Sequence, residues 1–258
     1  KKLIILPTIF PDGTSQVWKL PPEILQANAF EIRWDFEDEG EFMTLASLKH
    51  LLDGRGYVSL YMPYLPYARQ DKPVSNDSTF NLHTFARLIN SLEFSNVISV
   101  DVHNPTLANK LIDNFQNQTI FSVFLDEHKG EWDCVCFPDV GATARYAFHL
   151  DIPFIYFKKE WNQSTGEIIN QELTLSGPIS GLRVLIADDL CDGGQTFTPA
   201  ANALWRSEVR SIDLFVTHGV FSKGSKKFMD MGISNVYSTT SFKPYRDTGL
   251  EFVTQIKV

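Results

Sequence analysis

The sequence has few cysteines, no long apolar run and no excess of positive charge. Its 258 residues include only three cysteines, Cys134, Cys136 and Cys191, and their spacing is not that of a four-ligand metal site. So few cysteines also argue against a disulfide framework, and we expect reduced thiols in a cytoplasmic protein. The formal net charge of −8 argues against nucleic acid or an anionic membrane as the main partner.

The apolar stretch at the N-terminus is too short for a signal peptide or a membrane span, so we expect neither export nor membrane insertion. The chain is rich instead in residues that form cores: 43% are hydrophobic, including 20 Phe, 5 Trp and 8 Tyr. Its length suits one large α/β domain or two domains of about 130 residues each.

One stretch combines a strand, a glycine-rich turn and a helix start. Residues 184–190 form a short apolar run that ends with two adjacent carboxylates, Asp188 and Asp189, and the chain then breaks into Asp192, Gly193 and Gly194. An alanine-rich segment follows, in which we expect a helix over residues 196–208. Backbone N–H groups at such a turn can reach phosphate oxygens, and the helix dipole favours an anion there.

The polar residues of this stretch suit a phosphorylated sugar. Asp188 and Asp189 could accept hydrogen bonds from ribose hydroxyls or reach a hydrated Mg²⁺. An ordinary strand-to-helix turn capped by Asp is the alternative interpretation. The stretch resembles the phosphoribosyl diphosphate (PRPP) loop of the type I phosphoribosyltransferase fold, with Gly193 in place of the usual Thr and Gln195 in place of the usual Gly. The predicted sugar-phosphate site comprises Asp188, Asp189, Asp192, Gly193, Gly194, Gln195 and Thr196.

A second polar segment follows the strand expected at residues 57–62. Two prolines make residues 63–72 rigid and two tyrosines offer stacking faces. Arg69 could bind phosphate with its planar fork, Gln70 could read a base or ribose edge, and Lys72 could neutralise a triphosphate. A solvated charged loop is the alternative. The run is nearly identical to the Pro-Tyr-x-x-Tyr-Ala-Arg-Gln-Asp-Lys signature of the ribose-phosphate diphosphokinases, and the chain therefore resembles that family.

Two shorter segments extend the resemblance to the ATP site. Residues 10–17 are similar to a family segment that reaches across a subunit interface to hold adenine, which implies ATP contacts for Phe10 and Asp12 in a homo-oligomer, at least a dimer. A Pro-Asp-Gly hairpin turn explains the same residues equally well. Residues 101–104 resemble the family's Asp-Leu-His-Ala, which implies that His103 contacts ATP phosphates and Mg²⁺. A structural histidine at a strand end is the alternative.

Two further segments resemble parts of the family's catalytic machinery. Residues 138–142 are similar to Pro-Asp-x-Gly-Gly, which implies a metal role for Asp139 beside the transferred diphosphate. The strand expected at residues 153–157 leads into Lys158 and Lys159, in the place of the family's catalytic Lys-Arg on a flap. Cations are needed there because diphosphoryl transfer spreads negative charge over non-bridging oxygens. A surface lysine pair is the alternative.

The resemblance implies two doubly wound α/β domains of phosphoribosyltransferase type, with mainly parallel sheets and the site between them. Residues 1–123 would form the ATP-side domain, and residues 124–258 the domain with the ribose-phosphate loop. Further strands are expected at residues 1–6, 14–20, 29–36, 96–102, 133–139, 212–217, 235–239 and 252–258, and further helices at residues 41–52, 81–94 and 223–231.

The implied reaction is transfer of diphosphate from MgATP to the anomeric hydroxyl of ribose 5-phosphate, giving PRPP and AMP. Lys158, Lys159 and His103 would be catalytic, and Mg²⁺ the cofactor. Because Gly193 and Gln195 could open the loop for a phosphodiester, a second hypothesis takes ADP-ribose as the acceptor, for NAD salvage.

Three points remain open from the sequence. Trp161 or Phe197 could stack on the second adenine of ADP-ribose. A base phosphoribosyltransferase is a rival, although such an enzyme has no need of residues 67–72 as an ATP site. A catalytically silent homologue that regulates an active synthase is another, against which Lys158, His103 and Arg69 weigh.

Overall fold

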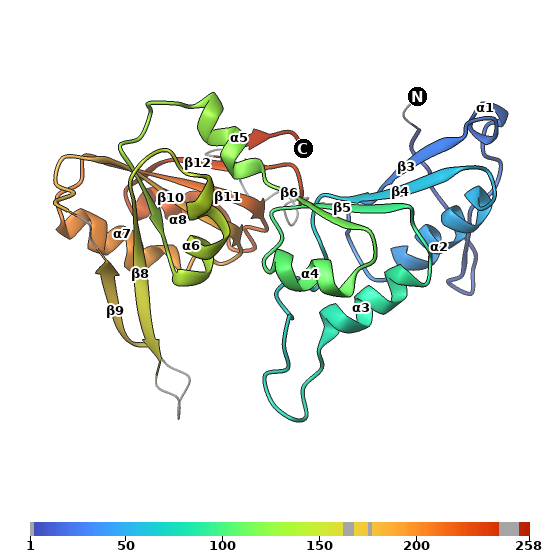
Figure 1. Cartoon of the computed structure of the whole chain (residues 1–258), viewed down its shortest axis with the longest axis horizontal. Helices are drawn as coiled ribbons and strands as arrows, with labels where there is room; N and C mark the ends of the chain where they lie inside the picture. Colours follow the sequence, from blue (N-terminus) through green and yellow to red (C-terminus); the bar gives the residue numbers. More distant parts are fainter. Residues whose placement is uncertain (1–2, 162–167, 175–176, 243–252) are drawn as a thin grey trace. The chain divides into compact units, whose positions relative to one another are not determined.

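The chain folds into two compact units, Lys1–Gln118 and Thr119–Val258 (Figure 1). The computed structural model describes residues 3–161, 168–174, 177–242 and 253–258. The division between the units lies just before helix α5 (Ile120–Glu127), and a boundary between residues 123 and 124 would fall within this helix. Helix α5 packs in the second unit, where Phe121 and Phe124 join a core with Phe215.

The first unit is built on a four-stranded parallel sheet in the order β3-β4-β5-β6. Its strands are β3 (Ala29–Arg33), β4 (Tyr57–Met62), β5 (Asn96–Val100) and β6 (Phe115–Gln118), and its helices are α1 (Pro22–Leu25), α2 (Glu41–Leu52), α3 (Asn81–Asn90) and α4 (Pro105–Leu111). The strands follow one another in sequence order. Right-handed crossovers therefore place α2, α3 and α4 on one face of the sheet (Figure 1).

The core of the first unit lies on that helix-covered face. Along β4, Val58, Leu60 and Met62 are buried and alternate with side chains that are exposed or half-buried. The alternation follows from the strand geometry, in which successive side chains point to opposite faces. Helix α3 contributes buried residues at helical spacing, namely Leu82, Phe85, Ala86 and Ile89.

The first residues of the chain differ from the sequence prediction. Strands were expected at residues 1–6 and 14–20, but the described residues form only a short antiparallel hairpin of β1 (Thr8–Ile9) and β2 (Ser15–Gln16). Leu3, Ile4 and Leu6 are exposed. In the described part of the first unit these residues pair with no strand, and an apolar run becomes a strand only where a neighbour completes its hydrogen bonds.

The second unit has a seven-stranded sheet in the order β13-β12-β11-β10-β7-β8-β9, in which only β8 and β9 pair antiparallel. The strands are β7 (Cys134–Phe137), β8 (Phe154–Trp161), β9 (Ile168–Thr174), β10 (Arg183–Cys191), β11 (Ser211–Gly219), β12 (Ile233–Thr239) and β13 (Val253–Ile256). The order reverses between β7 and β10, so this sheet is doubly wound, and open α/β sheets bind ligands at such a switch point.

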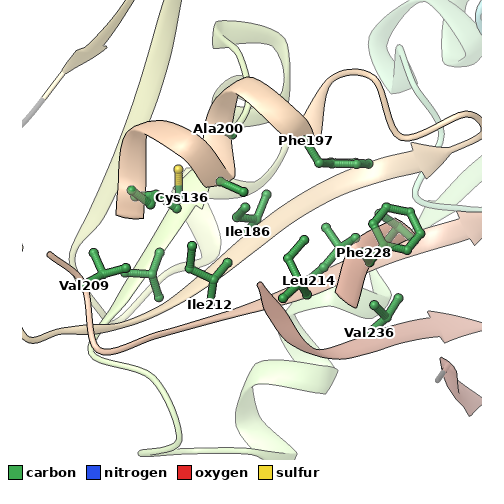
Figure 2. Packing of buried hydrophobic residues seen from close by; sticks show 14 of the residues in the cluster. Cys136, Ile186, Phe197, Ala200, Val209, Ile212, Leu214, Phe228 and Val236 are labelled. Carbon is green, nitrogen blue, oxygen red and sulfur yellow. The ribbon is translucent and has the colours of Figure 1, made fainter. Parts of the chain in front are cut away.

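Hydrophobic cores cover both faces of this sheet. The covering helices are α5, α6 (Val140–Tyr146), α7 (Phe197–Arg206) and α8 (Lys226–Asp230), with a 3₁₀ turn at Ala147–His149. In β10, Val184 and Ile186 face α7 and α8, whereas Leu185 and Ala187 face α5 and α6. Figure 2 shows the α7 side, with Ala200 above Ile186. The predicted α/β class with mainly parallel sheets is confirmed.

Two elements of the second unit differ from the sequence prediction. Strand β8 continues past residue 157 to Trp161 and pairs with β9, which the sequence did not predict because Asn170, Gln171 and Glu172 interrupt any apolar alternation. Helix α8 begins at Lys226 rather than at residue 223, because Gly224 has a φ of +73° and breaks the helical path. No helix in the described ranges is long and apolar enough to span a membrane.

Candidate functional site

The two carboxylates of the sugar-phosphate stretch lie within β10 rather than beyond its end. Asp188 pairs in register with Val216, and the strand continues to Cys191, opposite Gly219. Asp188 and Asp189 are only 8% and 4% exposed. A buried charge needs a partner, because the loss of hydration is otherwise uncompensated.

Arg145 on helix α6 supplies that partner. Its Nη2 lies 2.9 Å from Asp188 Oδ1 and 2.8 Å from Asp189 Oδ1. The sequence analysis missed this residue, which is 43 positions from Asp188. A signal was present, since adjacent carboxylates in an apolar strand require a cation and Arg145 is the only one in α6.

The three charges share a strongly perturbed electrostatic environment. Burial, and then the charge of Asp189, raise the pKa of Asp188 well above its usual value. Burial alone would lower the pKa of Arg145, but the carboxylates of Asp189 and Asp188 outweigh it, so the pKa of Arg145 rises. Burial and the neighbouring Asp189 carboxylate both disfavour the charged form of Asp188, which favours a proton on this carboxyl group.

Asp139 lies at the same switch point, after β7. Its Oδ1 accepts a hydrogen bond of 2.9 Å from the backbone N–H of Ala142, so it is the N-cap of α6. Its charge also contributes to the raised pKa of Arg145. The structure therefore brings together Asp139 and the predicted pair Asp188 and Asp189, around an arginine that the sequence reasoning did not single out.

The glycine loop, residues 192–196, connects β10 to α7. Gly194 has a φ of +71°, a conformation that favours glycine, and its carbonyl oxygen accepts from the N–H of Phe197 at 3.1 Å. Asp192 does not cap α7. Its Oδ1 accepts from the Ser222 hydroxyl, and Thr196 occupies the N-cap position without a side-chain cap bond. The helix start is thus left open to a ligand's hydrogen bonds.

Two aromatic residues were proposed from the sequence to stack on a second adenine. For Phe197 this is wrong, because it is only 1% exposed and packs edge-on against Phe228 in the core (Figure 2). The side chain of Trp161 lies outside the described part of the chain.

The predicted catalytic lysines lie on the β8–β9 hairpin. By backbone register, Lys158 is opposite Glu172 and Lys159 is opposite Gln171. The side chain of Lys158 is exposed. The side chain of Lys159 lies outside the described residues.

In the first unit, residues 63–72 follow β4 at the carboxyl edge of the sheet. Leu65 and Ala68 are buried and anchor the segment in the core. Tyr67 packs on Phe85 with ring centroids 5.3 Å apart and donates its hydroxyl to Glu39. Burial, together with that hydrogen bond, raises the pKa of Tyr67 to about 12. The tyrosine thus has a structural role, while Arg69, Gln70 and Lys72 are exposed.

Hydrogen bonds hold this segment against its neighbours. Gln70 Oε1 accepts from Asn81 Nδ2 at 2.7 Å. Asp71 Oδ2 accepts from Asn104 Nδ2 at 2.9 Å, and Asn104 also caps α4 through the N–H of Leu107. Since His103 directly precedes Asn104, the structure places the segment with Arg69 beside the segment with His103.

Phe10 and Asp12 lie in the turn of the N-terminal hairpin. Asp12 Oδ1 accepts from the N–H of Thr14 at 3.0 Å and from its hydroxyl at 2.7 Å, and these bonds lower the pKa of Asp12. Phe10 is 39% exposed. Asp12 therefore has a turn-forming role, and Phe10 remains accessible to a ligand.

The described residues contain no group of three or more His, Cys, Asp or Glu side chains arranged to hold a metal. A metal bound mainly by substrate phosphates and water requires only one or two protein ligands, which is the usual mode for Mg²⁺. The fold and the site together define an α/β protein in which a carboxylate-bearing strand leads into a glycine loop.

The comparisons with known proteins indicate which proteins of this type it resembles. No protein-family model matches the chain. It is 29% identical over 174 residues to a ribose-phosphate pyrophosphokinase of Cereibacter sphaeroides, an alignment that covers 64% of this chain and 51% of the relative. It is 26% identical over 209 residues to the enzyme of that name from Bacillus subtilis, covering 78% of this chain and 65% of the relative.

The structural comparison agrees with the sequence comparison. A phosphoribosylpyrophosphate synthetase of Mycobacterium smegmatis matches 98% of this chain and 86% of its own with a TM-score of 0.79, at 18% identity, which shows the fold. The resemblance to the ribose-phosphate diphosphokinases, named pyrophosphokinases in these relatives, is thus confirmed: the chain is a sequence relative of those enzymes. It spans about half to two thirds of their length.

Proposed function

We propose that the chain transfers the β,γ-diphosphate of MgATP to the 1-hydroxyl of ribose 5-phosphate, forming PRPP and releasing AMP. The observation that carries this proposal is the first-unit edge where Asp71 joins the Arg69 segment to the His103 segment. A base phosphoribosyltransferase has no use for a triphosphate site, so this edge favours the diphosphokinase reaction. The names of the sequence relatives support the same reaction.

In the first unit, exposed side chains would bind ATP. Arg69 would bind phosphate oxygens in pairs through its planar fork, and Lys72 would add a point charge. Gln70 would contact the base or ribose, and His103 the phosphates. Phe10, with Asp12 shaping its turn, would hold the adenine of a neighbouring subunit, which requires a homo-oligomer.

In the second unit, the β10 carboxylates would bind the acceptor. The ribose hydroxyls would donate hydrogen bonds to Asp188 and Asp189, which Arg145 holds in place. The glycine loop and the start of α7 would bind the 5-phosphate. Lys158 and Lys159 would stabilise the charge that develops on the non-bridging oxygens during transfer.

The donor set of the chain fits Mg²⁺. Asp139 provides carboxylate oxygens, the ligands that Mg²⁺ prefers, and the Ala142 bond uses one of several acceptor positions. In the second unit Asp139 would hold a metal, and in the first unit His103 would hold a metal on the triphosphate, with phosphate oxygens and water completing each shell. When bound, Mg²⁺ would neutralise part of the triphosphate charge.

A groove beside α7 favours ADP-ribose as a second candidate acceptor. The groove has a volume of about 560 Å³, within the size range of small-molecule sites. Its lining includes Gln195 of the glycine loop, residues of α7 as far as Arg206, and Phe157 of β8. A substituent on the 5-phosphate would have room along this helix. The named relatives give no support to this acceptor.

The test is AMP release from MgATP with ribose 5-phosphate or ADP-ribose as sole acceptor, with the product identified by mass. AMP and PRPP from ribose 5-phosphate are expected. ADP-ribose 1-diphosphate as the only product would assign the second acceptor. If neither acceptor gives any AMP, both proposals are contradicted. Binding of a nonhydrolysable ATP analogue without turnover would identify the silent homologue.

Two variants test whether the carboxyl edge of the first-unit sheet takes part in the reaction. Arg69→Ala should raise the KM for ATP at least about tenfold, because a charge-assisted phosphate contact is lost. Arg55→Ala is the matched control, since Arg55 is also exposed but lies after α2, where its Nε donates to Leu51 O. If the two variants change the KM for ATP equally, this edge no longer supports the proposed reaction.

A further inference from the structure

Two lysine side chains border the glycine loop. A Cβ placed on Gly194 would lie 2.8 Å from Cε of Lys227, and a Cβ on Gly193 would lie 3.7 Å from Cδ of Lys223. The Lys227 ammonium also donates a hydrogen bond to the carbonyl oxygen of Gly193. Gly194 thus leaves room that the Lys227 stem occupies, whereas the Lys223 stem lies at ordinary contact distance from Gly193.

The ammonium groups of Lys223 and Lys227 lie close enough at this loop to influence one another. Burial lowers the pKa of Lys227, and the charge of Lys223 lowers it further. Cys191 and Asp192 act in the opposite direction and raise it. Burial raises the pKa of the Cys191 thiol to about 12, so this thiol is neutral at pH 7. Asp192 is then the one carboxylate among these groups to offset two ammonium ions. Adjacent like charges repel, and a bound anion would relieve that repulsion.

The loop also lacks a side-chain donor that the sequence resemblance leads one to expect, since Gly193 replaces the usual Thr. We propose that Lys223 and Lys227 replace this donor and bind the phosphate group of the acceptor sugar at the glycine loop. This inference rests on the proposed function and assigns two further specificity-determining residues to its acceptor site. Gly194 allows the Lys227 side chain to approach the backbone, because a Cβ at this position would lie too close to it.

The experiment is a calorimetric titration of the intact protein with ribose 5-phosphate in the absence of ATP. Lys223→Ala and Lys227→Ala should each raise the Kd about tenfold or more, because each removes a charge-assisted contact to phosphate. Lys226→Ala is the matched control, since Lys226 is an exposed neighbour in the same helix and should leave the Kd unchanged. Lys223→Arg should restore most of the affinity lost in Lys223→Ala.

Two features keep the test decisive. Lys227→Ala also removes the bond to Gly193 and could disturb the loop, but Lys223 is exposed and its variant leaves that bond in place. An unchanged Kd in Lys223→Ala would overturn the proposal, as would an equal loss in Lys226→Ala. A titration with ribose, which has no phosphate, should show weak binding that none of the variants changes.

Binding and turnover separate this inference from the proposed function. Lysine-dependent binding of ribose 5-phosphate without AMP release would refute the reaction and support the phosphate site. AMP release with binding that does not depend on the lysines would support the reaction and refute the phosphate site.

Discussion

The two units place their polar site residues in opposite environments. In the first unit, Arg69 and Lys72 are exposed, on a segment whose buried anchors are Leu65 and Ala68. In the second unit, Asp188 and Asp189 are buried within a strand that is covered on both faces. The difference teaches that the same strand-loop-helix pattern can organise a site by anchoring an exposed loop or by enclosing a charge cluster.

The comparison predicts different sensitivities. A charge cluster within a sheet that is covered on both faces depends on its counter-ion for stability, because an unpaired buried charge destabilises the folded state. An exposed segment depends on local hydrogen bonds, which contribute less to stability but fix its position.

The largest effect is expected from Arg145→Met. Removing the guanidinium takes away the cation that both buried carboxyl groups contact, and we expect a loss of about 3–5 kcal/mol in the free energy of unfolding, measured by urea denaturation. Arg183→Met is the matched control, because Arg183 pairs with Asp133 at a site where both side chains are more than one third exposed. Comparable losses in the two variants would contradict the role of burial.

The next effect concerns pH. The folded-state pKa of Asp188 is raised, so the folded protein holds this proton more tightly than the unfolded chain. The contribution of this proton to the free energy of unfolding is complete below the unfolded-state pKa and is lost as pH rises through the folded-state pKa. The loss is about 1.4 kcal/mol for each unit by which the two pKa values differ. The unfolding free energy of the wild type should therefore fall with rising pH relative to Asp188→Asn. A pH-independent difference would show that Asp188 does not hold the proton.

A smaller effect is expected at the glycine loop. Gly194→Ala should lower the unfolding free energy by about 1–2 kcal/mol, because φ is +71° and the added Cβ would meet Lys227 at 2.8 Å. Gly193→Ala should cost less, since its nearest contact is 3.7 Å away. Thermal unfolding of both variants provides the measurement, and the reverse order of stabilities would argue against the observed loop conformation.

The smallest effect on stability is expected from Asp71→Ala in the first unit. Loss of the bond to Asn104 should lower the unfolding free energy by about 0.5–1.5 kcal/mol, yet raise the KM for ATP, because the bond positions two segments of the proposed ATP site. Asp77→Ala provides the control, since Asp77 accepts from Ser75 in the exposed loop that follows. An unchanged KM in Asp71→Ala would remove the positioning role.

Elements with clean periodicity were predictable from the sequence. Helix α2 and strand β4 have the bounds expected from their apolar spacing and the glycines between them. Strand β9 was missed because its order comes from pairing with β8 and not from its own pattern. The N-terminal strand failed for the opposite reason, since its apolar residues have no pairing partner within the described residues.

The site was predictable only in its local motifs. The sequence placed the carboxylates, the glycine loop and the Arg69 segment, because each is a contiguous pattern. It did not find Arg145 or Lys227, which reach their partners across 43 and 34 residues of sequence. Such contacts depend on which helix covers which strand, and this follows from tertiary packing.

The most direct test of the central claim uses ATP labelled at its β-phosphorus, with ribose 5-phosphate as the acceptor. The account predicts that the label moves with the γ-phosphate into the sugar 1-diphosphate and that the AMP is unlabelled. Label retained in ADP, with a single phosphate transferred to the sugar, would contradict diphosphoryl transfer and with it the function proposed for both units.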